Sequence, residues 1–99
     1  MKRILPNERI LNVDHVLIPS GVLKTFVEGA FSAVMPQMKD ELLRDMINSG
    51  IRFDDKTAHH SLSQIRDYLH LVLGPNAAEI LVDALRNSLE STGQFEKYG

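Results

Sequence analysis

The chain has 99 residues, of which 43% are hydrophobic and 24% charged, and its formal net charge is −2. This size and composition predict a single globular domain over residues 1–99 and exclude a wholly disordered chain. No segment concentrates Lys and Arg, so binding to nucleic acid should be weak.

The chain contains no cysteine, which excludes disulfides, thiolate metal sites and thiol nucleophiles. A small domain without disulfides is typical of a reducing compartment, so we expect a cytoplasmic protein. No apolar run approaches the roughly 20 residues of a membrane span, and none resembles the apolar region of a signal peptide.

The first nineteen residues have the weakest helical pattern. They are predicted to form a variable N-terminal arm that is an extended segment, a short hairpin or a short helix. The arm is nevertheless apolar at its end, where Val16, Leu17 and Ile18 stand together. Pro19 and Ser20 close it, with Ser20 as the predicted N-cap of the first helix.

Apolar residues at helical spacing predict the first helix between Ser20 and Met35. Pro36 ends this helix, because a residue before proline is pushed out of the α region, and suits the first turn of the next one. The second helix runs to about Ile47 and stops at Gly50, which can adopt a left-handed conformation.

The third helix has two possible starts. Ser61 and Gln64 have the spacing of a capping box, and this start leaves residues 52–60 as a loop. A start at Thr57 would instead place the two adjacent histidines on the helix. In either case the helix ends at Gly74.

Pro75 or Asn76 opens the fourth helix, so the Gly-Pro-Asn step is predicted to be a corner between helices rather than a phosphate-binding loop. Ile80 and Val82 lie outside the main apolar stripe of this helix. A helix that is apolar nearly all round is either central to a bundle or shared with a partner. Residues 92–99 are predicted to be a flexible tail.

These elements predict an all-α fold: a compact bundle of four short helices, with room for a fifth, after a short N-terminal extended arm or hairpin. Residues 1–19 are the arm, residues 20–91 the helical core and residues 92–99 the tail.

Residues 23–89 resemble a small all-helical archaeal family, the Nitrosopumilus output domain type. The resemblance is carried by Lys39-Asp40-Glu41-Leu42-Leu43, Asn48-Ser49-Gly50-Ile51, Leu71-Val72-Leu73-Gly74 and Ala77-Ala78-Glu79-Ile80-Leu81. Members occur alone or joined to signalling modules such as receiver domains, so the resemblance implies a helical signalling or regulatory output domain. It implies no catalytic residues.

His59 and His60, with Asp54 and Asp55 nearby, are the best metal-ligand candidates. Adjacent histidines on a regular element point in different directions, however, and no metal-binding motif surrounds them. We favour a structural role over a metal site: His60 precedes the capped helix and packs near Ile65. No metal and no cofactor are therefore predicted.

Two pairs of polar residues could carry chemistry on helices. Asp67 and His70 are spaced to face one another, which predicts a local surface pair. Glu79 and Asp83 could form an acid–base pair if they were buried, but their helical phase places them on the outer, solvated side. No nucleophile or phosphate-binding motif is present, so the protein is predicted not to be an enzyme.

The favoured function is a non-enzymatic interaction module that forms a homodimer, because the chain has more apolar surface than one small core explains. The predicted interaction surface comprises Ile80, Val82, Val16, Leu17 and Ile18. The alternative is a small DNA-binding regulator with a helix-turn-helix at Gly74-Pro75, although its recognition helix would begin almost without cations. The sequence identifies no other protein partner.

Overall fold

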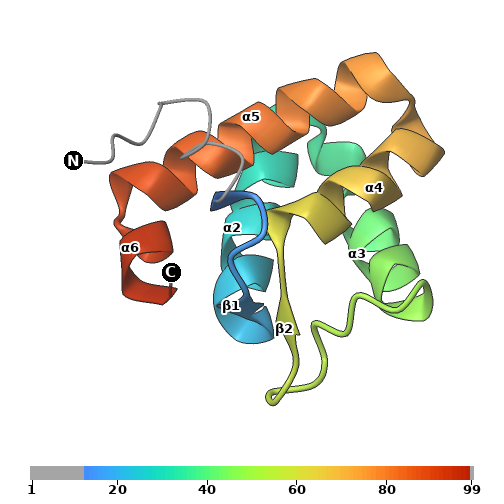
Figure 1. The fold of residues 1–99 in the computed structure, drawn as a ribbon. Coiled ribbons are helices and arrows are strands. Elements are labelled where there is room, and N and C mark those ends of the chain that lie inside the picture. The colour runs from blue at the N-terminus through green and yellow to red at the C-terminus, as the bar shows by residue number, and fades with distance from the viewer. Residues whose placement is uncertain (1–12, 99) are drawn as a thin grey trace.

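Four helices of at least ten residues form the body of the protein, which confirms the all-α prediction (Figure 1). They are α2 (Ser20–Val34), α3 (Lys39–Asn48), α4 (Leu62–Leu73) and α5 (Pro75–Ser91). A 3-10 turn, η1 (Pro36–Met38), joins α2 to α3, and a short helix, α6 (Gln94–Tyr98), follows α5. The computed structural model describes residues 13–98, so the predictions for residues 1–12 and for Gly99 lie outside the described part.

The end of the N-terminal arm is extended and pairs with a distant segment. Strand β1 (Ile18–Pro19) lies antiparallel to β2 (His59–His60), with Ile18 opposite His60. Successive side chains of an extended chain point to opposite sides, which explains why Ile18 is buried while Leu17 is exposed. At Ile18–Pro19 the arm is therefore extended, one of the predicted options, and its pairing partner lies outside the arm.

The start of α2 is held by the loop that precedes β2. Ser20 is the first residue of α2, and Pro19 is its N-cap. The Ser20 hydroxyl donates to the carbonyl of Asp55 at 2.6 Å, and the Ser20 N–H donates to the carbonyl of Ala58 at 2.9 Å. The capping prediction for Ser20 is therefore wrong, because its hydroxyl makes a long-range contact instead.

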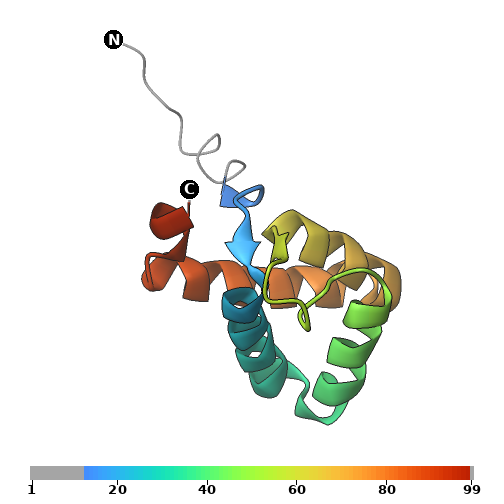
Figure 2. The ribbon, with the colours of Figure 1, turned by 90° about the horizontal axis from the view of Figure 1, so that it is seen from below.

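The ends of α2 and α3 lie at the predicted helix breakers. Helix α2 ends at Val34, and Pro36 opens η1, where its missing N–H costs nothing. Helix α3 ends at Asn48, and Gly50 has a φ of 106°, which favours glycine. The two helices form a V that η1 closes (Figure 2).

A capping box starts α4, as the sequence predicts. The Ser61 hydroxyl accepts a hydrogen bond from the Gln64 N–H at 3.3 Å, and the Gln64 side-chain oxygen accepts one from the Ser61 N–H at 3.1 Å. The alternative start at Thr57 is wrong, because His59 and His60 form β2 rather than a helical turn.

A single residue, Gly74, joins α4 to α5, so the predicted corner is confirmed. Gly74 is the C-cap of α4 and the N-cap of α5, with φ 82° and ψ 166°. The positive φ is as predicted, but ψ lies far from the left-handed helical value, in a region open almost only to glycine. Pro75 then takes the first helical position.

Helix α5 is central to the fold. Both α4 and α2 pack against it, and the contact with α4 is the more extensive (Figure 1). Contact from two sides explains why α5 is apolar nearly all round. Within the described residues no helix, α5 included, combines the length and hydropathy that a membrane crossing needs. The largest fully buried side chains of the core are Ile18, Leu23, Val27, Phe31, Met46, Leu62, Ile65, Leu69, Leu81, Val82, Leu85 and Leu89.

The predicted flexible tail is wrong for residues 94–98, which form α6. Gly93 has a φ of 73°, and this turn directs α6 back toward the body (Figure 1). Phe95 is buried there and joins the core. Phe95, together with the half-buried Tyr98, therefore holds the last helix, and no periodic apolar pattern in so short a segment could predict it.

Candidate functional site

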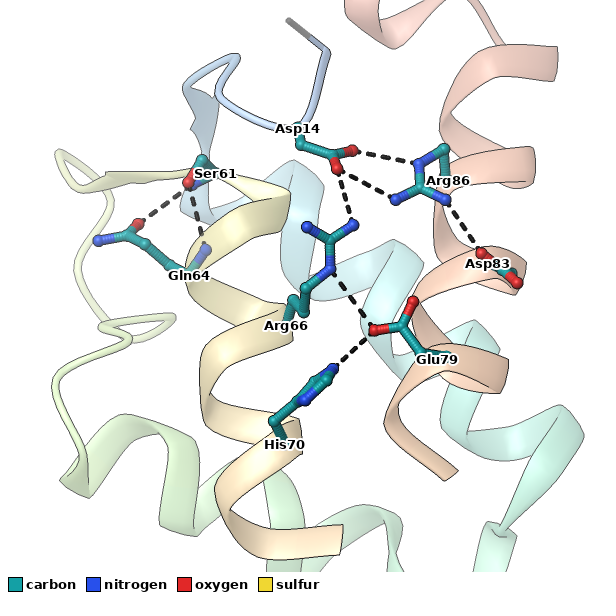
Figure 3. A network of polar contacts seen from close by, with 8 residues as sticks. All are labelled: Asp14, Ser61, Gln64, Arg66, His70, Glu79, Asp83 and Arg86. Atoms are coloured by element: carbon teal, nitrogen blue, oxygen red, sulfur yellow. Dashed lines mark hydrogen bonds and ion pairs between the residues drawn. The ribbon is translucent and has the colours of Figure 1, made fainter. Parts of the chain in front are cut away.

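Asp14 is the centre of a buried charge network that joins the arm to two helices (Figure 3). Its side chain is only 4% exposed. Arg66 on α4 donates from Nη2 to Oδ2 of Asp14 at 2.7 Å. Arg86 on α5 donates from Nε to Oδ1 and from Nη2 to Oδ2, both at 3.1 Å. The Asp14 carbonyl also accepts the N–H of Ser63 at 2.9 Å, so this residue fixes the arm through both backbone and side chain.

Two further carboxylates, both on α5, extend this network. Oε2 of Glu79 lies 2.6 Å from Nε2 of His70 and 3.7 Å from Nε of Arg66, while Asp83 accepts a hydrogen bond from Arg86 at 3.0 Å. Burial acts to lower the pKa of Arg86, but the hydrogen bonds and charges of the neighbouring aspartates raise it overall.

The network corrects one prediction and qualifies another. His70 pairs with Glu79 across the α4–α5 contact, so the predicted pair with Asp67 on the same helix does not form. Glu79 and Asp83 are both exposed enough to meet solvent, as predicted, yet each is held by a cation. Neither carboxylate is among the residues that line the grooves found within residues 13–98, and their observed contacts hold the cations of the network.

The histidines of β2 point in different directions, as adjacent residues of a strand do. His60 is buried, with Nε2 accepting the N–H of Arg52 at 3.0 Å and Nδ1 lying 3.1 Å from the Gln64 side-chain oxygen. The ring also meets Phe53 edge-on. These two bonds require the neutral ring with its proton on Nδ1, and they leave no nitrogen free for a metal.

The side chains of the other candidate ligands make only local contacts. His59 is exposed, with Nδ1 lying 3.2 Å from the carbonyl of Thr57. Asp54 forms an ion pair with Arg52 at 3.0 Å, and Asp55 accepts hydrogen bonds from Thr57. Among residues 13–98 no group of three or more ligand-type side chains is placed to hold a metal ion.

The predicted interaction surface is only partly exposed. Ile80 is 60% exposed, Leu17 is exposed and Val16 is half-buried. The prediction is wrong for Ile18 and Val82, which are fully buried. Ile18 points inward from β1, and Val82 is covered because α5 packs against neighbours on two sides.

A groove between α2 and α5, here called the α2–α5 groove, is the best candidate for an interaction site. It measures about 460 Å³, and none of the described residues that line it carries a charge. Gly29 and Ala33 on α2 face Ala84 and Ser88 on α5, and these short side chains leave the helix backbones accessible. The floor includes Phe26 and Ala30. The groove can therefore receive a closely approaching apolar element.

An exposed apolar side chain extends one wall of this groove. Ile80 precedes Ala84 by one helical turn, so both residues lie on the same face of α5. On α2, Val34 follows Ala30 by one turn and is also exposed. The groove together with Val34 and Ile80, here called the α2–α5 face, thus combines a hollow with apolar side chains beside it.

The small residues of the groove were not predicted to be functional. Gly29 and Ala33 stand four residues apart on the outer side of α2, and Thr25 continues the same row. This row is the signal that could have indicated a groove. Small residues add little to an apolar stripe, so apolar periodicity does not reveal this row.

Comparison of the chain with protein-family models, curated proteins and solved structures gives no match. The resemblance to the Nitrosopumilus output domain type therefore stays a prediction. In the structure, the segments that carry it begin α3, end α3, end α4 and lie in the first turns of α5. These segments mark where the helices begin and end, and they do not form a site.

Proposed function

We propose that the protein is a non-enzymatic helical interaction module that forms a homodimer through the α2–α5 face. The α2–α5 face comprises the groove together with Val34 and Ile80. The observation that supports this proposal best is the uncharged groove beside an exposed isoleucine. A role in signalling or regulation, as the family resemblance implies, is part of the same proposal.

A second copy of the chain suits this face because the face is self-complementary. In a two-fold dimer the same surface of each copy meets its counterpart, so it must supply both a projection and a hollow. Ile80 is the projection, and the space beside Gly29 and Ala84 is the hollow. The lack of charge in the groove also removes like-charge repulsion between two identical faces.

The distribution of cations argues against the DNA-binding alternative. Arg86 is the single Lys or Arg of α5, which would be the recognition helix after the Gly74 corner. Arg86 is already paired with Asp14 and Asp83. A recognition helix without free cations has little to attract phosphates.

The test is the oligomeric state of the wild-type protein and three variants at tens of micromolar, measured by sedimentation velocity. Gly29→Gln places a long polar side chain in the groove, and nothing lies within 4 Å of the added Cβ, so the fold should persist. Gly21→Gln makes the same change on α2 outside the groove and is the matched control.

We expect wild type and Gly21→Gln to be dimers, and Gly29→Gln to dissociate at least about tenfold more readily, as for a substitution at the centre of an interface. Ile80→Ser should weaken the dimer in the same direction. A monomeric wild type would contradict the proposal. If the two glutamine variants dimerise equally, the interface lies on another face of the protein.

A further inference from the structure

A second groove, here called the α3–α4 groove, lies between the end of α3 and the last turns of α4. It measures about 370 Å³ and has the buried Ile51 and Tyr68 among its lining residues. Leu71 and Val72 line it from α4. Leu71 is 88% exposed, more than any other large apolar side chain of the described chain. Leu71 adjoins the exposed Val72, and adjoining exposed apolar side chains beside a groove are typical of interaction sites.

The surroundings of the α3–α4 groove are negative. Asp67 lines the groove, and within residues 13–98 no cation pairs with it. The carboxylate of Asp45 is fixed next to the groove by the Tyr68 hydroxyl, which donates to it at 2.6 Å. Arg52, which follows Ile51 in the chain, is already paired with Asp54.

Helix geometry adds to this negative potential. Helices α3 and α4 both end at the groove, and the carbonyl end of a helix carries partial negative charge. The last turn of α3 contains no basic residue that would offset it, and His70, the basic residue in the last turn of α4, pairs with Glu79 instead. A positively charged group is therefore favoured at this site.

We propose that the α3–α4 groove docks a short basic and apolar segment of a partner protein. An apolar side chain of the segment covers Leu71 and Val72, and a lysine or arginine reaches Asp67. The uncharged α2–α5 face has no cation to offer Asp67, so the two grooves suit different occupants. This docking site goes beyond the proposed dimer and does not depend on it.

The probe is a pair of synthetic peptides with identical leucines at helical spacing, one with lysines on the flanks and one with glutamates. Each peptide is titrated into isotope-labelled full-length protein, and amide signals are followed by NMR. We expect the lysine peptide to shift the signals of Gly50, Asp67 and Leu71 but not that of Gly29. The glutamate peptide should bind more weakly.

Charge reversal tests the role of Asp67. Asp67→Lys should weaken binding of the lysine peptide at least about threefold, as for loss of an exposed ion pair, and should strengthen binding of the glutamate peptide. Glu90→Lys makes the same change on α5 and should leave both affinities unaltered. Leu71→Ser should abolish binding while the protein stays folded, because the side chain is exposed.

Three results would overturn the proposal: equal affinity for the two peptides, equal effects of the two charge reversals, or signal changes confined to the α2–α5 face. A change of oligomeric state in Leu71→Ser would also overturn it, because a second copy would then cover this groove. Loss of the dimer in Gly29→Gln should leave peptide binding to the α3–α4 groove unchanged. The dimer proposal and the docking proposal can therefore be refuted independently.

Discussion

Oδ2 of Asp14 lies 2.7 Å from Nη2 of Arg66, although the two residues are 52 positions apart. This contact and the two bonds from Arg86 place a nearly fully buried carboxylate between two cations. A buried charge is tolerated only when it is paired, so the position of the arm depends on these bonds as well as on the burial of Ile18.

Asp14→Asn should lower the free energy of unfolding by about 2–3 kcal/mol. The amide keeps the shape of the side chain but leaves the two arginines without their shared anion. The loss is smaller than for a fully buried pair, because Arg66 keeps some exposure to solvent. Urea denaturation measures the change.

Asp83→Asn is the matched control for this substitution. Asp83 pairs with the same Arg86, but its side chain is 63% exposed. Its loss should therefore change stability by no more than about 0.5 kcal/mol. Equal effects of the two substitutions would show that the burial of Asp14 adds nothing.

Local features of the chain predict most of the fold. Pro36, Gly50, Gly74 and the capping box of Ser61 bound the helices through interactions within a few residues, and the structure confirms each of them. What the sequence could not predict depends on distant neighbours. The burial of Phe95 by the turn at Gly93 is one example.

The candidate sites were harder to predict than the helices. Ile80 and Val82 look alike in the sequence, yet one is exposed and the other is in the core. The difference follows from which sides of α5 its two neighbours cover, and that is decided by tertiary packing. The arginine partners of Asp14 were missed for the same reason, since no local pattern links the arm to α4 and α5.

The contrast between Ile80 and Val82 leads to a simple prediction. Val82→Ala removes buried methyl groups and leaves a cavity, so we expect a loss of roughly 2 kcal/mol in the free energy of unfolding. Ile80→Ala should change it by no more than about 0.5 kcal/mol in the monomer. Thermal unfolding at low protein concentration compares the two, and equal losses would contradict the burial pattern.

Gly74 provides a test of backbone geometry. An alanine Cβ at this position would meet nothing within 4 Å, so any effect must come from the backbone. With φ 82° and ψ 166°, Gly74→Ala should lose about 1–3 kcal/mol of stability. Gly21→Ala, within α2 and equally free of contacts, should gain up to about 1 kcal/mol. A Gly74→Ala protein as stable as wild type in urea would exclude this conformation.

The Tyr68–Asp45 bond should make stability depend on alkaline pH. Burial, followed by the hydrogen bond and charge of Asp45, raises the pKa of Tyr68. A raised pKa in the folded state means that the stabilisation is complete below the unfolded value of about 10 and is lost as the pH rises above it. Tyr68→Phe should therefore lose about 1–2 kcal/mol at neutral pH, and its difference from wild type should shrink above about pH 10. Urea denaturation of both proteins from neutral to alkaline pH measures this difference, and a constant difference would show that the hydroxyl is not buried against Asp45.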